Sequence, residues 1–222
     1  MPAKRKTTKK TTRLPARKTA KKVVKPAAKR ASAKLLAARL PIIPEDKMSP
    51  AQRDLVAAIS SGPRGAYRPQ GPFAVFLQSP EYGNLAQQLG AHCRYNTVIP
   101  PRLSEFAILV TARLWRAQYE WFAHAPIAEK AGVKKQTIAD LRAGRTPTKA
   151  ARDEKLIYAV IQELYATKRV SQGNYAKLQK LFGDAGMVEF VGILGYYALV
   201  AMSLNVFQMM PPEGAELAFP EK

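Results

Sequence analysis

The sequence predicts an all-α domain, and three observations lead to that prediction. From Ser49 onward, apolar residues recur three and four positions apart, which places them on one face of a helix. Glycine and proline interrupt these periodic stretches at intervals that suit helix ends. No two stretches show the alternating pattern that would pair them as strands. We therefore expect about eight helices packed as a bundle.

The first expected helices lie between residues 49 and 96. Ser49 can cap a helix that begins at Pro50, and the glycines and prolines of residues 61–72 end it. Residues 73–78 are short and apolar, so they fit either a helical turn or a strand. We expect a further helix over residues 79–96, with Ser79 as its cap and proline in its first position.

The later helices show stronger apolar periodicity. The pair Pro100–Pro101 precedes one helix, and a second begins near Arg116, runs to about Ala131 and ends at Gly132. Gly144 ends a short helix that follows. A long amphipathic helix over 148–168 comes next, then helices over 171–183 and 187–210.

The most apolar run of the chain extends from Gly192 to Met210 and is nearly long enough to span a bilayer. It contains Ser203, Asn205 and Gln208, so we interpret it as the buried helix of a helical domain and expect no membrane association.

Charge divides the chain into a basic tail, residues 1–40, and a helical domain, residues 41–222. The tail holds 15 of the 36 Lys and Arg residues and none of the 16 acidic residues, so the domain carries a formal charge of only +5. The tail lacks aromatic residues and is expected to be disordered.

Several functions fit this tail. It could bind nucleic-acid phosphates without sequence specificity, serve as a mitochondrial transit peptide, or be a plain solvated tail, with Met48 as an alternative start. No secretory signal is visible, and we expect a cytoplasmic protein of bacterial type, with mitochondrial targeting as the alternative.

A single cysteine, Cys93, rules out an internal disulfide and a cysteine-based metal site. One free thiol is compatible with a reducing compartment.

The stretch "AQYEWFAH" is the main candidate for a functional site. Its Glu120 and His124 are four positions apart and share one face of the expected helix. Glu105 lies on the preceding helix and reaches His124 if the two helices pack antiparallel. These side chains could form an acid/base pair, an ordinary surface pair, or, with His92, a metal site. Two histidines among scattered carboxylates are weak evidence for a metal, and we expect neither a metal nor a cofactor.

The segment "LSEFAILVTARLW…YEWFAHAPIAEKAGVKKQTIADLRAG" resembles the carboxymuconolactone decarboxylase family, within the alkylhydroperoxidase D-like superfamily. The family pattern joins a glutamate early in one helix to a histidine in the next, followed by a segment that is matched here from Ala128 to Ile138. The flanking pieces "SGPRG", "GPF", "LQSPEY" and "GYY…LN" also agree, so the resemblance covers roughly residues 39–212. It implies an alkylhydroperoxidase D-like helical bundle.

The chain departs from the peroxidase branch of that superfamily at the two cysteines. When the branch's pattern is aligned on Glu105, the cysteine positions fall on Ala117 and Glu120 and the histidine falls on His124. Thiol peroxidase chemistry needs a thiolate that attacks the peroxide and a second thiol that resolves the product. A peroxidase or peroxiredoxin activity inherited with the family name is therefore unexpected.

The resemblance implies a cofactor-free lyase or isomerase that acts by acid/base chemistry on a small carboxylated lactone or a related oxygenated acid. His124 would transfer the proton, with Glu120 or Glu105 as its partner. An arginine would hold the substrate carboxylate, with Arg94, Arg102 and Arg113 as candidates. Tyr119 and Trp121 are the aromatic residues expected to line the same pocket.

The family also implies a homo-oligomer, a trimer or hexamer, for which Gly192 and Gly195 would allow close approach. The alternative function is a catalytically altered member of the family that associates with nucleic acid through residues 1–40.

Overall fold

The computed structural model describes Met1, Ala3 and residues 36–220. This part of the chain contains eight α-helices and no β-strand, which confirms the all-α prediction. The predicted basic tail lies outside the described residues, apart from Met1, Ala3 and its last five residues. Those last residues reach the end of the final helix, where the backbone N–H of Arg39 donates a 3.0 Å hydrogen bond to the carbonyl of Phe207.

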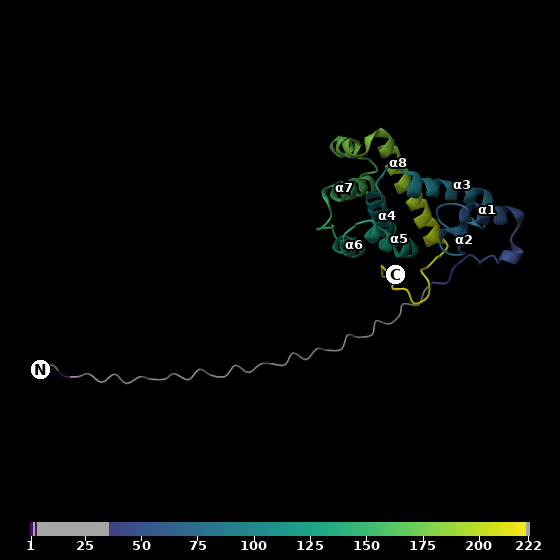
Figure 1. The fold of residues 1–222 in the computed structure, drawn as a ribbon, viewed down its shortest axis with the longest axis horizontal. Helices are drawn as coiled ribbons and strands as arrows, with labels where there is room; N and C mark the ends of the chain where they lie inside the picture. Colours follow the sequence, from purple (N-terminus) through teal and green to yellow (C-terminus); the bar gives the residue numbers. More distant parts are fainter. Residues whose placement is uncertain (2, 4–35, 221–222) are drawn as a thin grey trace. The chain divides into compact units, whose positions relative to one another are not determined.

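The helices follow one another with short connections (Figure 1). Two short elements accompany them, a 3₁₀ turn η1 (Glu45–Lys47) and a π-helical turn η2 (His92–Asn96). The α-helices are α1 (Pro50–Ser60), α2 (Pro72–Phe76), α3 (Pro80–Ala91), α4 (Pro101–Trp115), α5 (Gln118–Lys130), α6 (Lys135–Arg142), α7 (Arg152–Thr167) and α8 (Gln172–Val206).

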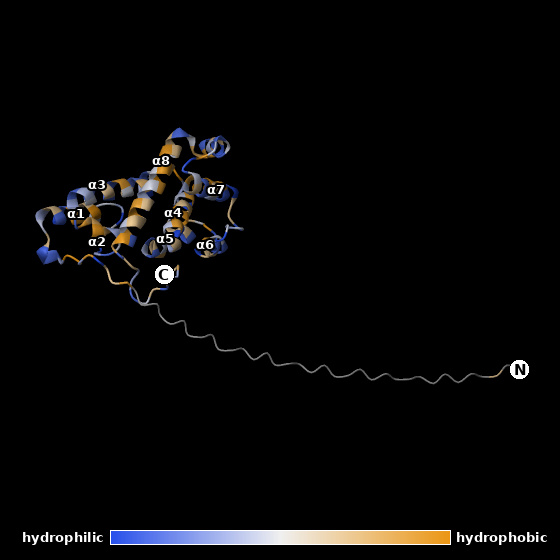
Figure 2. Ribbon diagram, turned by 180° about the vertical axis from the view of Figure 1, so that it is seen from behind, coloured by the Kyte–Doolittle hydropathy of each residue, from blue (hydrophilic) through white to orange (hydrophobic). Residues whose placement is uncertain are grey.

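Helix α4 is the centre of the domain. Every residue from Leu103 to Ala112 is buried, and α4 packs against α5, α7 and α8. Helices α6 and α7 lie on one side of α4 and helices α1 to α3 lie on the other (Figure 1). Hydrophobic residues concentrate on α2, α4 and the second half of α8, where these helices meet (Figure 2). Polar side chains on α4 therefore sit inside the core, which is where the candidate site lies.

Local sequence signals explain most helix ends. Ser49 caps α1 through a capping box with Gln52, as expected. Gly132 and Gly144 have φ angles of 105° and 72° and end α5 and α6. Ser79 stands at the N-cap of α3, but its side chain makes no capping hydrogen bond, so that expectation is corrected.

The structure decides between the two alternatives for residues 73–78 and shows how the last two expected helices are joined. Residues 73–78 lie in or just after α2, whose start is set by Gly71 and Pro72, so the helical alternative holds. The helices expected over 171–183 and 187–210 are both present and follow each other directly within α8, separated by a kink at the non-helical Gly183. Gly183 has φ 68° and ψ 179°, so the backbone turns there and resumes a helix at once.

By length and composition, α8 is the one helix in the described part of the chain that could cross a membrane. In its most apolar window, 44% of the residues are buried. That buried face, which includes Ile193, Tyr197 and Leu204, packs in the core with α4.

Candidate active site

The turn between α4 and α5 brings the predicted acid/base residues together. Arg116 adopts a left-handed conformation (φ 54°) at the end of α4, and Ala117, which is fully buried, starts α5. The chain reverses there, so the beginning of α4 lies beside the middle of α5. Oε2 of Glu105 is 2.7 Å from Nδ1 of His124, across nineteen residues of sequence. The sequence predicted contact between Glu105 and His124 only if the two helices pack antiparallel, and the structure shows that contact.

This pair is buried. Glu105 is 4% exposed and His124 is 7% exposed. A carboxylate that accepts a hydrogen bond from Nδ1–H holds the ring in one orientation and leaves Nε2 to exchange a proton. The geometry is that of a general acid or base whose orientation is fixed by a second residue.

Glu120, on the same helix as His124, is in a different state. It is 2% exposed, and neither of its carboxyl oxygens has a hydrogen-bond partner among the described residues. Burial raises the pKa of Glu120 well above its usual value. The neutral, proton-carrying form of this carboxyl is therefore favoured, as in acids whose pKa is adapted to proton donation.

Tyr197 of α8 is a further member of the site that sequence reasoning missed. Its ring meets the imidazole of His124 edge to face, with centroids 5.0 Å apart. Burial raises the pKa of Tyr197 well above 10, and the negative charge of Glu105 adds to the effect. The residue lies 73 positions beyond His124, in a run whose periodicity indicates only a buried helix, so no local signal identifies it.

A cavity of about 250 Å³ opens near the start of α5. Three arginines contribute to its wall, and none of the described residues that line it is acidic. Tyr119 forms part of the wall and packs so tightly on Gly71 that a Cβ there would lie 2.3 Å from its ring. The lining residues are Ile59, Arg64, Gly65, Ala66, Tyr67, Arg68, Gln70, Phe73, Arg94 and Tyr119.

Arg94 and Tyr119 were predicted as substrate-binding residues, and both lie in this wall. Arg64 and Arg68 were missed. Their only signal is the loop "SGPRGAYRPQG", in which two arginines accompany a tyrosine between glycines. The hydroxyl of that tyrosine, Tyr67, is buried without a hydrogen-bond partner among the described residues.

The positive charges of the cavity affect the pKa values of two tyrosines, Tyr196 and Tyr197. Burial raises the pKa of Tyr197, and the positive charge of Arg94 partly offsets that rise. Burial raises the pKa of Tyr196, the neighbour of Tyr197, to about 12, against a smaller opposing effect of Arg64. The acid/base residues themselves do not line the cavity. The pKa of Tyr197 responds to charges from both sites, to Glu105 of the pair and to Arg94 of the cavity.

The other predicted contacts lie elsewhere. Arg102 forms ion pairs with Asp153 and Glu154, the latter at 2.6 Å, so its guanidinium is already engaged. Arg113 lines a second cavity. Trp121 packs edge to face against Phe219, with centroids 5.3 Å apart, and does not line the arginine-rich cavity.

The lone thiol is in a poor position for redox chemistry. Cys93 is 3% exposed, and burial raises the pKa of its thiol, with a smaller contribution from the charge of Glu189. The thiol form is favoured over the reactive thiolate. In the described part of the chain, no three His, Cys, Asp or Glu side chains cluster as metal ligands.

Comparison with known families places this site in context. The model of the carboxymuconolactone decarboxylase family matches residues 80–163, from the start of α3 into α7. The matched segment includes Glu105, Glu120 and His124, and it confirms the resemblance seen in the sequence. No curated protein and no solved structure matches the chain.

Proposed function

We propose that the pair Glu105–His124 and the acid Glu120 catalyse a cofactor-free lyase or isomerase reaction. The three residues lie in the segment 80–163 that matches the model of the carboxymuconolactone decarboxylase family. The substrate is a small carboxylated lactone or a related oxygenated acid. The observation that carries the proposal is the buried 2.7 Å contact between Glu105 and His124 beside an unpartnered buried carboxyl.

The energetics of burial favour a catalytic role for these groups. A buried carboxyl with no hydrogen bond costs stability, and a hydrophobic residue of the same size would pack there at no such cost. Ionisable groups with strongly perturbed pKa values are typical of active sites. Glu120 meets that description, and the oriented imidazole of His124 lies four residues further along the same helix.

The proposed reaction breaks the bond between a carbon atom and a substrate carboxylate. The electron pair moves into the conjugated lactone as carbon dioxide leaves, and a proton is then delivered to carbon. His124 or the neutral Glu120 supplies that proton, while Glu105 holds the imidazole in place. Arg94, Arg64 and Arg68 hold the remaining carboxylate, because guanidinium groups bind carboxylates through paired hydrogen bonds.

The substrate must reach the pair from the cavity. Since the acid/base residues do not line the cavity, the wall formed by Tyr119 and the loop 61–71 has to shift when substrate binds. Gly65 and Gly71, which have positive φ angles, are in that loop and give it conformational freedom.

Turnover of γ-carboxymuconolactone tests the proposal. Carbon dioxide release and loss of substrate absorbance are followed for the full chain, for His124→Ala and for Glu105→Gln. Removal of a general acid or base typically lowers kcat by a factor of about 10²–10⁴. The control is His92→Ala, which removes the other histidine, a half-exposed residue that contacts Glu189 at 3.3 Å.

The proposal predicts that His92→Ala keeps the native rate and that His124→Ala loses it. Equal rates in the native chain and His124→Ala would refute the assignment. If the native chain does not turn over this lactone, the same four proteins are screened against other small lactones and oxygenated acids. A screen without any His124-dependent turnover would reject the lyase proposal.

We also propose that the exposed face of α8 joins copies of the chain. Val188, Val191, Met202 and Val206 are between 43% and 74% exposed there, and a Cβ on Gly195 would meet nothing within 4 Å. Light scattering of the native chain and of Val191→Glu tests this. A lower mass for the variant is expected, and identical masses would contradict the interface.

Association with nucleic acid through residues 1–40 is the alternative function, and it rests on their charge alone. Deletion of these residues should abolish retardation of a DNA fragment in a gel and leave catalysis intact. Retardation that survives the deletion would exclude the tail as the cause.

A further inference from the structure

Arg113 has no role in the proposed reaction, and its guanidinium lacks the ion pair that is usual for a partly buried arginine. Its guanidinium makes no hydrogen bond or ion pair with any described residue, and its Nε is buried without a partner. The guanidinium lies over the ring of Phe219, whose centroid is 5.2 Å from Cζ. Charges that are removed from water are generally paired, so a guanidinium without a paired anion is available for a ligand.

The neighbouring backbone accommodates this arginine. Gly144, which follows α6, has a φ of 72°, and a Cβ built there would lie 2.4 Å from Nη2 of Arg113. Only glycine fits both the left-handed backbone and the guanidinium at that point. The chain therefore holds Arg113 against the α6–α7 connection.

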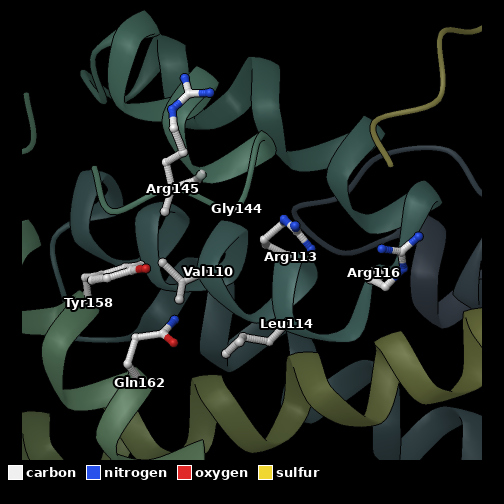
Figure 3. A pocket seen from close by; sticks show the side chains of 9 residues that line it. Val110, Arg113, Leu114, Arg116, Gly144, Arg145, Tyr158 and Gln162 are labelled. Carbon is white, nitrogen blue, oxygen red and sulfur yellow. The ribbon is translucent and has the colours of Figure 1, made fainter. Parts of the chain in front are cut away.

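Arg113 lines a cavity of about 230 Å³ between α4, the end of α6 and α7. Tyr158 and Gln162 of α7 lie on one side of it, and Arg113 and Arg116 lie on the other, with Val110 and Leu114 between them (Figure 3). The full lining is Val110, Arg113, Leu114, Arg116, Leu141, Gly144, Arg145, Tyr158 and Gln162. None of these residues is acidic.

Some polar side chains of the wall already have hydrogen-bond or ion-pair partners, and others do not. Arg145 pairs with Asp140 at 2.9 Å, and Arg116 donates to the backbone carbonyl of Pro220. Arg113, the hydroxyl of Tyr158 and the amide of Gln162 have no recorded hydrogen-bond partner within residues 36–220. The cavity thus offers one unpaired cation and two neutral hydrogen-bonding groups beside the apolar side chains of Val110 and Leu114.

We propose that this cavity is a second binding site, and that it takes a small monocarboxylic acid with a short apolar or aromatic body. The carboxylate pairs with Arg113, and the body packs against Val110, Leu114 and the ring of Tyr158. Arginine suits a carboxylate in this setting because its donors match the two oxygens. The site does not depend on the proposed catalytic function, since it shares no lining residue with the arginine-rich cavity near Tyr119.

Methyl NMR of the full chain tests the proposal with benzoate as the probe. Val110 and Leu114 line this cavity, and Ile59 lines the other one. Titration with benzoate is expected to shift the methyl signals of Val110 and Leu114. Shifts confined to Ile59, or no saturable shifts, would overturn the assignment.

Substitutions provide a second test by calorimetry. Arg113→Gln removes the charge and should weaken benzoate binding at least tenfold, the loss expected for a charge-assisted hydrogen bond. Arg152→Gln, which removes an exposed arginine of α7 that lines neither cavity, is the matched control and should bind as the native chain does. Equal affinities for the native chain and Arg113→Gln would refute the role of Arg113.

Arg113→Gln also loses the contact with Phe219 and could unfold locally. Leu114→Trp avoids this problem, because Leu114 is 36% exposed and a larger side chain fills the cavity without touching that contact. A folded Leu114→Trp that no longer binds benzoate supports the site. A folded Leu114→Trp with native affinity places the ligand elsewhere and overturns the proposal.

Discussion

Substitution of Glu120 by glutamine should stabilise the protein relative to the native chain, by an amount that grows as the pH rises. Burial raises the pKa of Glu120 well above its usual value, and neither carboxyl oxygen has a hydrogen-bond partner among the described residues. The unfolded chain exposes this carboxyl to water and ionises it near pH 4.5, while the folded chain retains the proton. The Glu120 contribution to stability is therefore fully present below about pH 4.5 and is lost as the pH rises through the folded pKa.

The size of the effect follows from the proton count. Between the two pKa values the folded state holds one proton more than the unfolded state, so the free energy of unfolding falls by about 1.4 kcal/mol per pH unit. Two pH units inside this range correspond to about 2.7 kcal/mol, a large part of a typical stability of about 5–15 kcal/mol. Glutamine carries no proton equilibrium, so Glu120→Gln lacks this slope.

Urea unfolding of the full chain, followed by the fluorescence of Trp115 and Trp121 at fixed protein concentration, measures the slope from pH 4.5 to 8. The difference in unfolding free energy between Glu120→Gln and the native chain should grow with pH. Glu129→Gln is the control, since Glu129 lies on the same helix with about half of its side chain exposed. Parallel curves for Glu120→Gln and the native chain would show that Glu120 is ionised in the folded protein, and the reasoning would fail.

Three further predictions concern the stability of the helices around the site and the reactivity of the Cys93 thiol. Gly83→Ala should cost about 1–3 kcal/mol in urea unfolding, because a Cβ there lies 2.5 Å from the carbonyl oxygen of Phe76; Gly173→Ala, with open space around it, should cost nothing comparable. Glu189→Gln should lower stability by about 1–3 kcal/mol at pH 7, since this carboxylate accepts two 2.7 Å hydrogen bonds from the loop before α4; hydrogen bonding lowers the pKa of Glu189, so the loss should shrink as the pH falls through that pKa, and a constant loss would contradict this account. The native chain and Cys93→Ser should consume an organic hydroperoxide equally slowly in the presence of dithiothreitol, because the buried thiol is held in its protonated form; faster consumption by the native chain would restore the peroxidase alternative.

The helices were predictable because their signals are local. Apolar periodicity, the Ser49 cap and the glycines after α5 and α6 each act within a few residues of the helix end that they set. Gly183 follows the same rule, because its backbone is not helical and it separates the two helical parts of α8. Residues on both sides of it bury apolar side chains in the same core.

Apart from Arg94 in η2, the site residues that the sequence predicted correctly lie on α4 and α5. The spacing of Glu120 and His124 places both on one helix face, and the family pattern points to Glu105. Contact between Glu105 and His124 depends on the left-handed Arg116, which sequence does not reveal. Tyr197 reaches the site from another helix, and that proximity is a product of the tertiary fold.

The core of this domain holds three ionisable side chains that stability alone does not explain. Glu105, Glu120 and His124 are each less than 10% exposed, and they lie where α4, α5 and α8 pack most tightly. An apolar set of similar volume would avoid their desolvation, as replacements of buried polar groups in other proteins show. Glu120 makes the argument strongest, because it has no described hydrogen bond to offset its burial. The proposed function accounts for such a group, because a substrate that enters through the arginine-lined cavity beside Tyr119 would hydrogen-bond to it.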